Sequence, residues 1–332
     1  MCKRILLTGA TGALGPTILS ELIKNGHIIR VFTRKVPDKV LLPPEIELEL
    51  GDITDAKAIS NALRNIDTVV HMAALLHVVK PPSSLVPEYE RVNIEGTRIV
   101  VETAIKNRVQ RLIFFSTIAV YGSGQGRLLT EDSEPAPDTP YAKSKLAGEK
   151  LVLAARRFDG QPFGVVLRLG AVYGARIKGN YRQLVLALAT NRFIPIGKGE
   201  NRRTLVYDKD VARAVLLTIH HPGAAGRIYN VTDGQVHTIR EINQAICAAL
   251  HRKPPKFYLP VGPVRAVAGL IEDAAYLVRR PSPVGRATID KYIEDMAVDG
   301  QRIQTELGFR PAYDLYTGWA DAIQQMRRQG IL

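Results

Sequence analysis

The chain has 332 residues, of which 46% are hydrophobic, so it is long enough for one large α/β domain, or for a large domain with a smaller one attached. This hydrophobic content excludes a disordered chain. The formal net charge is +13, but the basic residues are scattered, without the aromatic–basic interleaving of RNA-binding proteins. We therefore expect a phosphate-bearing small ligand rather than nucleic acid.

Cysteine usage and the start of the chain predict a cytoplasmic location. Neither Cys2 nor Cys247 lies in a metal-binding or redox spacing, so we expect a reducing compartment and no metal site. The first predicted strand begins almost at Met1, which leaves no room for a signal peptide.

The most apolar late stretch, Leu259 to Val278, is a poor candidate for a membrane span. Arg265, Glu272 and Asp273 interrupt it. We expect a helix that packs on the core. The alternative is a helix that lies on a membrane surface, since Arg279 and Arg280 follow it.

The chain begins with the pattern of a strand, a glycine-rich turn and a helix. Ile5 to Thr8 is typical of a buried parallel strand, and Pro16 suits the first turn of a helix that ends near Gly26. Gly9, Gly12 and Gly15 lie between them. Such a turn allows a phosphate to approach the backbone, and the helix N-terminus offers unpaired N–H groups. The pattern predicts a dinucleotide-binding site.

The second predicted strand, Ile28 to Phe32, ends in a basic tip. In dinucleotide-binding folds, an acid at this place accepts from the 2′-hydroxyl of NAD. Here the tip reads Thr33-Arg34-Lys35, without an acid. Two adjacent cations suit a 2′-phosphate, so the sequence favours NADP over NAD; the alternative is a solvated basic turn.

Two further strands, Ile46 to Leu50 and Asp67 to Ala74, continue the pattern. Asp52, just after the first of them, is placed to accept from the adenine amino group. The small Ala73 and Ala74 would let the backbone approach the cofactor, whereas we expect His71 to be a packed core residue. A helix from about Glu88 to Lys106 follows, with Asn93 early in it.

Strands and helices alternate as far as the sixth strand. Arg111 to Ser116 and Phe163 to Gly170 are strands, and Tyr141 opens a helix that continues to about Arg157. This alternation predicts a doubly wound, Rossmann-type parallel sheet in a domain spanning residues 1–172.

The alternation weakens beyond Val172. Residues 173–332 are expected to form a smaller, mainly helical substrate-binding domain. One strand, Arg227 to Val231, is expected to return to the large sheet. The expected helices are Asn180–Thr190, Lys209–His220, Ile239–His251, Val264–Val278 and Leu315–Gln329.

Tyr141 and Lys145 carry the predicted chemistry. They are four residues apart at the start of a helix, so they share one face. An ammonium beside a phenol favours the phenolate and lowers its pKa from about 10. A hydroxyl from Ser116 or Thr117, at the end of the neighbouring strand, could hold a substrate oxygen. Such a set can move a proton while a nicotinamide moves a hydride.

Taken together, these motifs resemble the extended short-chain dehydrogenase/reductase family of the NAD-dependent epimerase/dehydratase type. The resemblance covers nearly the whole chain, as far as Leu307-Gly308-Phe309-Arg310-Pro311. The segments that carry it are Thr8 to Gly15, Gly51-Asp52, His71 to Ala74, Val92 to Thr97, Ser116-Thr117 before Val120-Tyr121-Gly122, and Tyr141 with Lys145. The family includes nucleotide-sugar epimerases, dehydratases and ketoreductases.

The resemblance implies a role for each matching residue. Tyr141 would be the general acid/base, Lys145 would lower its pKa and bind the nicotinamide ribose, and Thr117, rather than Ser116, would hold the reacting oxygen. The residues expected to bind the cofactor are Gly9, Thr11, Gly12, Ala13, Leu14, Gly15, Arg34, Lys35, Asp52, Ile53, Ala73, Ala74, Asn93, Tyr141 and Lys145.

The second half of the chain is similar to nucleotide-sugar 4-ketoreductases and 4-epimerases. Arg203 lies where such enzymes send an arginine to the diphosphate, and Asn180 is expected at the nucleotide. His77, Ser116 and Thr117 are further expected substrate contacts. The resemblance thus implies an enzyme acting at C4 of a nucleotide-diphosphate sugar. The basic strand tip favours a UDP-4-keto-sugar reductase.

Three alternatives remain open at this point. They are a UDP-sugar 4-epimerase, a steroid- or flavonoid-type alcohol dehydrogenase, and a non-catalytic cofactor-sensing protein. Intact Tyr141 and Lys145 argue against the last of these. The resemblance also implies a homodimer, paired through the helices near Glu88–Lys106 and Tyr141–Arg157.

Overall fold

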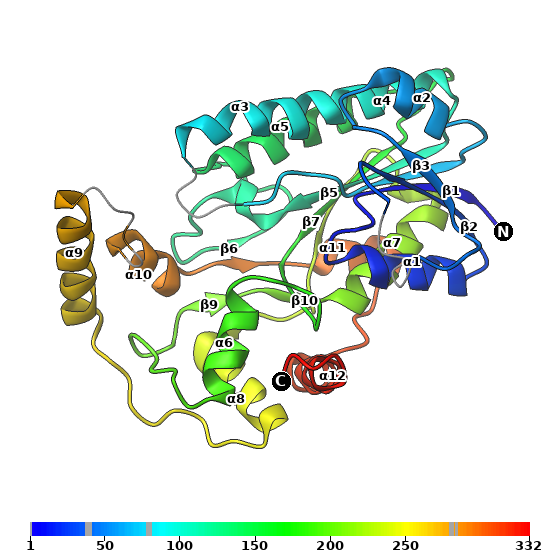
Figure 1. The fold of residues 1–332 in the computed structure, drawn as a ribbon. Helices are drawn as coiled ribbons and strands as arrows, with labels where there is room; N and C mark the ends of the chain where they lie inside the picture. Colours follow the sequence, from blue (N-terminus) through cyan, green and yellow to red (C-terminus); the bar gives the residue numbers. More distant parts are fainter. Residues whose placement is uncertain (1, 37–41, 78–81, 279–281, 283–284) are drawn as a thin grey trace.

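A seven-stranded, all-parallel β-sheet forms the centre of the molecule (Figure 1). The computed structural model describes residues 2–36, 42–77, 82–278, 282 and 285–332. Along the sheet the strand order is β11-β7-β5-β4-β1-β2-β3. The strands are β1 (Arg4–Thr8), β2 (Ile28–Thr33), β3 (Glu47–Leu50), β4 (Thr68–His71), β5 (Arg111–Thr117), β7 (Gly164–Leu169) and β11 (Ile228–Val231).

This order confirms the predicted doubly wound fold. Strand order reverses at β1, which pairs with β2 on one side and with β4 on the other. In such sheets the crevice beyond the carboxyl ends of the strands, at the reversal, binds ligands. The predicted return of residues 227–231 is also confirmed, since β11 pairs in parallel with β7.

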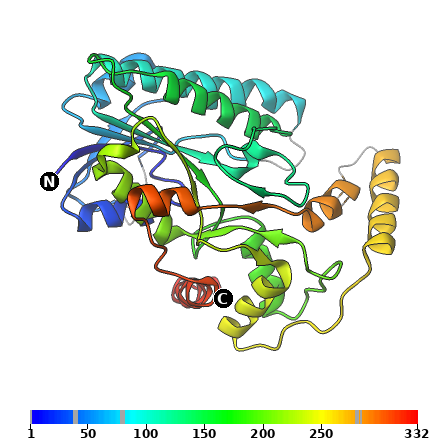
Figure 2. The same ribbon diagram turned by 180° about the vertical axis from the view of Figure 1, so that it is seen from behind.

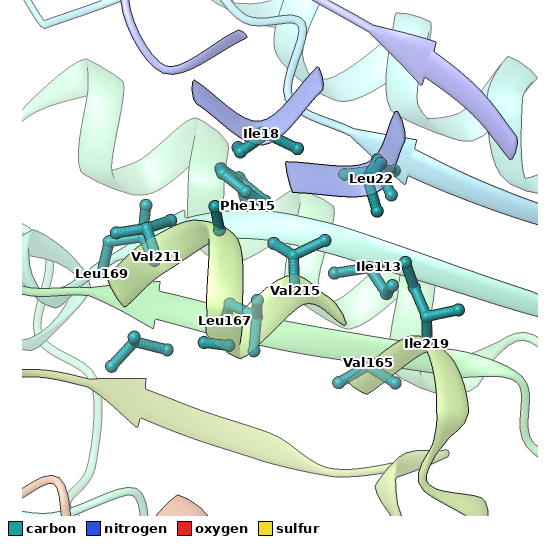
Figure 3. Close-up of a cluster of buried hydrophobic side chains, with 14 of the residues drawn as sticks. Ile18, Leu22, Ile113, Phe115, Val165, Leu167, Leu169, Val211, Val215 and Ile219 are labelled. Atoms are coloured by element: carbon teal, nitrogen blue, oxygen red, sulfur yellow. The ribbon is translucent and has the colours of Figure 1, made fainter. Parts of the chain in front are cut away.

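Helices cover both faces of the sheet. One face carries α2 (Ala56–Ala62), α4 (Gly96–Lys106) and α5 (Pro140–Ala154), and the other carries α1 (Gly15–Lys24) and α7 (Asp208–His220). Figure 3 shows how side chains of α1 and α7 meet those of β5 and β7. Ile18, Phe115 and Val215 lie in this cluster, and all three are buried. Burial of these apolar faces holds the carboxyl ends of the strands in place.

The remaining elements lie mostly in the second half of the chain. A separate apolar cluster joins α6 (Asn180–Ala189), α8 (Ile239–Leu250) and α12 (Leu315–Arg328), where Trp319 stacks on Tyr173 at 4.3 Å. Short strands are β6 (Leu128–Leu129), β8 (Ala171–Tyr173), β9 (Arg202–Arg203), β10 (Leu205–Tyr207), β12 (His237–Thr238) and β13 (Ala297–Val298). Single turns are η2 (Ser83–Leu85), η4 (Ile118–Tyr121) and η5 (Pro222–Ala224).

Three regions differ from the expected elements. The helix expected over residues 88–106 consists of α3 (Val86–Tyr89), a π-helical segment η3 (Glu90–Glu95) and α4. The helices α10 (Arg286–Ile293) and α11 (Gln301–Leu307) were not predicted. The helix α9 (Val261–Leu277) was expected to pack on the core. Instead it stands at the edge of the molecule, against α10 (Figure 2). Arg279 and Arg280 lie outside the described residues.

Candidate active site

The glycine-rich turn between β1 and α1 is closely packed against its own backbone and the end of β4. Gly9 has a φ of +75°, and a Cβ there would lie 2.7 Å from the backbone nitrogen of Ala73. A Cβ on Gly15 would lie 1.8 Å from the carbonyl oxygen of Ala10. Side chains are therefore excluded at both positions. The α1 N-cap, Leu14, has an apolar side chain that cannot accept from the first-turn N–H groups. This turn fits a pyrophosphate.

The other expected cofactor residues surround the same end of the sheet. Thr11 and Gly12 are exposed in the turn, and Ala13, Ala73 and Ala74 are half-buried, whereas Ile53 is buried beneath Gly96. Arg34 and Lys35 are exposed just beyond β2. Burial disfavours the Asp52 carboxylate, but hydrogen bonds from Thr54 and the charges of Arg91 and Arg34 outweigh this and lower its pKa. The exposed cations after β2 therefore lie near one ionised carboxylate, that of Asp52 after β3.

His71 is a packed structural residue, as expected. Its Nδ1 lies 2.7 Å from the Thr8 hydroxyl, and its Nε2 lies 3.0 Å from the Thr97 hydroxyl. Thr97 already donates to the carbonyl of Asn93, so it accepts from His71 Nε2. Burial lowers the pKa of His71 to about 3, with help from the charge of Lys145. The neutral ring therefore holds the ends of β1 and β4 to the helix that follows β4.

Asn93 fixes the loop that follows β4. The side chain is buried within η3; its Oδ1 accepts from the Leu75 N–H at 2.7 Å, and its Nδ2 donates to the Leu75 carbonyl and to Ser144 Oγ. These bonds use both N–H groups of the amide and one lone pair of its oxygen. Asn93 therefore positions this loop against α5.

Tyr141 and Lys145 lie one turn apart at the start of α5, which Thr139 caps. The Tyr141 ring lies beside His77 and Tyr89, with ring centroids 5.9 and 6.3 Å away. Lys145 is buried, and its Nζ lies 4.2 Å from the centre of the Phe114 ring on β5. Both side chains therefore lie over the carboxyl half of the sheet, beside the predicted cofactor crevice.

The pKa of Tyr141 is shifted in the direction opposite to our expectation. Burial raises it to about 12, and Tyr89 adds to the effect. Burial also lowers the pKa of Lys145 to about 7, against the opposing charge of Glu149. Desolvation therefore outweighs any attraction between the pair in the protein alone. Tyr141 is held as a neutral phenol, the form that can donate a proton.

Ser116 and Thr117 are successive residues of β5, so their side chains point to opposite sides of the strand. The Ser116 hydroxyl is buried and donates to the Glu149 carboxylate. The expectation that Ser116 contacts substrate is therefore not met. Thr117 is half-buried, and its hydroxyl accepts from the Ala119 N–H at 3.2 Å. Its hydroxyl proton stays available, which agrees with the choice of Thr117 as the reacting position.

A buried ion pair beneath the site was not foreseen. Arg168 Nη2 lies 2.6 Å from Glu149 Oε2, and both side chains are about 2% exposed or less. The guanidinium also lies 4.8 Å from the centre of the Tyr121 ring. The sequence could have indicated that Glu149 lies near the site, because it follows Lys145 by four residues and shares its helix face.

On the substrate side, Arg203 packs against the carbonyl end of α10. Its guanidinium donates to the carbonyls of Lys291, Tyr292 and Glu294, at the end of α10. These donors complete the helix terminus, where carbonyls lack helical partners. Asn180 is exposed at the first position of α6, and His77 is exposed after β4.

A hollow of about 450 Å³ lies between α10 and the 123–138 loop. Lys291 of α10 and Asp138 of the loop line it. Burial lowers the pKa of His77, Lys291 lowers it further, and Asp138 opposes them. The hollow is therefore electrostatically linked to His77, the ring neighbour of Tyr141.

Comparisons with known proteins agree with this geometry. The model of the NAD dependent epimerase/dehydratase family matches residues 5–232. The UDP-glucose 4-epimerase of Vibrio cholerae is 29% identical over 98% of this chain and 95% of its own. A 3 beta-hydroxysteroid dehydrogenase/Delta 5-->4-isomerase of Mycobacterium tuberculosis is 25% identical over 93% of this chain and 86% of its own. The structure of MoeE5 in complex with UDP-glucuronic acid and NAD matches with a TM-score of 0.76 and 27% identity, over 98% and 99% of the two chains.

Proposed function

The chain belongs to the NAD-dependent epimerase/dehydratase family, and we propose that it acts at C4 of a nucleoside-diphosphate sugar, reducing a UDP-4-keto-sugar. The observation that carries the proposal is the placement of Tyr141 and Lys145 on α5, next to β5, which ends at Thr117. Thr117 ends β5 at the carboxyl edge of the sheet, the edge at which β1 also leads into the glycine-rich turn. When bound there, the nicotinamide cofactor supplies the hydride.

The chain's own residues would handle the proton. Thr117 Oγ1 would donate a hydrogen bond to the C4 carbonyl oxygen and orient it. Tyr141, held neutral by burial, would give its proton to that oxygen as the carbonyl is reduced. Lys145, next along the helix face, would stabilise the resulting phenolate until a proton returns.

We further propose that NADP(H) is preferred to NAD(H). Arg34 and Lys35 at the end of β2 support this, since two exposed cations favour a 2′-phosphate. The second candidate function is a UDP-sugar 4-epimerase, favoured by the similarity to the Vibrio cholerae enzyme over nearly the whole chain. A steroid alcohol dehydrogenase is a weaker candidate, because an apolar substrate needs no arginine at the position of Arg203.

Ligand-induced shifts of the melting temperature test the cofactor and substrate classes, because a ligand that binds the folded state stabilises it. NADP(H) should raise the melting temperature more than NAD(H) at equal concentration. The Arg34→Ala variant should narrow that gap, and Lys24→Ala, which removes a cation at the far end of α1, should not. An equal or larger shift with NAD(H) would overturn the NADP preference.

The same measurement with UDP-sugars tests the substrate class. A UDP-sugar should raise the melting temperature of the parent protein. Arg203→Ala should lower the starting melting temperature, because α10 loses its donors, and should also lose the ligand-induced shift. The matched control is Arg240→Ala, since Arg240 also donates to a backbone carbonyl, that of Lys198. Shifts with steroids, and none with UDP-sugars, would overturn the proposal.

A further inference from the structure

The helix α9 buries very little of its surface. Of its seventeen residues, all described, only Ala268 and Gly269 are buried. Figures 1 and 2 show the helix at one edge of the molecule, beside α10 and away from the sheet. A helix of a globular protein is usually held by an apolar face that packs on the core.

The polar side of α9 faces the protein. Arg265 forms a two-point ion pair with Asp290 of α10, at 2.7 and 3.0 Å. Glu272 accepts from the backbone N–H of Arg286, whose side chain pairs with Asp273 at 2.8 Å. Charged contacts thus fix α9 on α10.

The opposite side of α9 is an apolar stripe in solvent. Its residues follow the i, i+3, i+4, i+7 spacing of one helix face: Pro263, Val267, Leu270, Ile271, Ala274 and Leu277. Val267, Leu270 and Leu277 are 55%, 68% and 82% exposed. The helix is therefore amphipathic with its apolar side outward. A contiguous exposed apolar face of this kind marks an interaction surface.

The charge around α9 identifies the kind of surface that would cover the stripe. The segment before α9, from Arg252 to Pro260, holds three lysines and arginines and no acidic residue, and the charges of α9 itself are engaged with α10. Lys253 and Lys256 are exposed, next to Phe257, which is 84% exposed. A second copy would bring the same positive charges to the contact and be repelled, whereas an anionic lipid surface would attract them.

We propose that α9 and the preceding segment 252–257 form a contact with anionic phospholipid bilayers. The apolar stripe would enter the headgroup–acyl boundary, and Lys253 and Lys256 would bind lipid phosphates. Within the described residues, no helix is both long and apolar enough to cross a membrane. At about 1.5 Å per residue, α9 is about 25 Å long, which suits a helix lying along the surface.

This contact would orient the candidate active site. Asp290, which holds Arg265 of α9, also lines the hollow between α10 and the 123–138 loop. The lipid-bound helix would therefore keep the substrate side of the molecule close to the bilayer. The inference goes beyond the proposed function and does not depend on the reaction.

Flotation of the full chain with lipid vesicles tests the proposal. The protein should float with vesicles that contain about one third phosphatidylglycerol, and much less with pure phosphatidylcholine. Raising the salt from about 0.1 M to about 1 M shortens the Debye length from about 10 to about 3 Å and should weaken binding. A protein that stays with the soluble fraction under all these conditions would overturn the proposal.

Two variants and two matched controls locate the contact. Leu270→Glu with Leu277→Glu, and separately Lys253→Glu with Lys256→Glu, should each lower binding by about tenfold or more. Phe158→Glu removes an exposed apolar side chain elsewhere, and Lys24→Glu with Lys106→Glu makes the same charge change elsewhere. Equal losses in the controls would contradict the assignment to α9.

Light scattering of the α9 double variant separates a lipid surface from a second copy. The proposal predicts an unchanged molar mass and an unchanged thermal melt, since the substituted side chains are exposed. A fall in molar mass, together with no vesicle binding by the parent protein, would show that another copy covers the stripe and would refute the lipid contact.

Discussion

Tyr141 is the residue whose loss should reduce turnover most. In Tyr141→Phe the ring and its neighbours remain, but the proton donor is removed. Turnover should fall by about a hundredfold to ten-thousandfold, while cofactor binding stays nearly intact. Steady-state kinetics with a cofactor titration provide the measurement. Tyr316→Phe, on the exposed side of α12, is the control and should retain full activity. Activity of Tyr141→Phe within about twofold of the parent would reject the role.

Lys145 links function to stability at the same site. Because burial lowers its pKa from the usual 10.5 to about 7, the folded protein disfavours the charged form that the unfolded chain carries. The cost of this is fully present below about pH 7 and disappears as the pH rises toward 10.5. Burying Lys145 therefore lowers the free energy of unfolding at neutral and acidic pH.

The variant Lys145→Met should therefore be more stable and inactive. Without cofactor, its melting temperature should exceed that of the parent by about 5 °C near pH 6.5, and the gain should shrink steadily toward pH 10. Thermal melts across this range check the sign. A gain that grows with pH, or a melting temperature below that of the parent at pH 6.5, would contradict the account.

At the scale of elements, α4 and α5 present a shared groove to solvent. It has a volume of about 480 Å³. Its apolar lining residues are Ile94, Val101, Ile105, Ala147, Leu151, Ala154 and Ala155. We propose that two copies pair here about a two-fold axis, so that each α4–α5 pair covers the other.

Light scattering at micromolar concentration tests this pairing. The parent should have the mass of a dimer, and Leu151→Arg should be monomeric, because the charge would be buried in the contact. Tyr316→Arg, which adds the same charge on α12, should stay dimeric. A monomeric parent protein would contradict the prediction.

Much of the Rossmann half was predictable because its elements repeat with clear periods. The strands β1, β4, β5 and β7 are mostly apolar runs that are buried in the sheet. Gly26 indicates where the helix α1 ends. The spacing of Tyr141 and Lys145 likewise follows from helix geometry alone. Such features depend on residues that are close together in the sequence, so a short stretch of sequence is enough to predict them.

Features that depend on distant segments could not be predicted in this way. The sequence does not reveal that Ser116 donates to Glu149, that burial governs the pKa of Tyr141, or that α10 supplies the carbonyls bound by Arg203. The exposure of α9 was also missed. Its amphipathic pattern predicts that one face is covered, but not that the polar face is the covered one.

At the scale of the whole molecule, the proposed chemistry draws on both halves of the chain. The first half supplies the glycine-rich turn, Thr117 at the end of β5, and Tyr141 on α5. The segments from β8 onward carry Asn180, Arg203 and α10, which we propose form the substrate side. The direction of the reaction then depends on whether oxidised cofactor leaves after each cycle, as in a reductase, or stays bound, as in an epimerase.

The most direct test of the central claim is a pair of assays on the purified chain. One contains a UDP-4-keto-6-deoxyhexose with stoichiometric NADPH, and the other contains a UDP-hexose with catalytic cofactor. The account predicts that NADPH is consumed in the first, mole for mole with loss of the 4-keto-sugar, and that no C4 epimer forms in the second. Interconversion of C4 epimers in the second assay, with no NADPH consumed in the first, would contradict it.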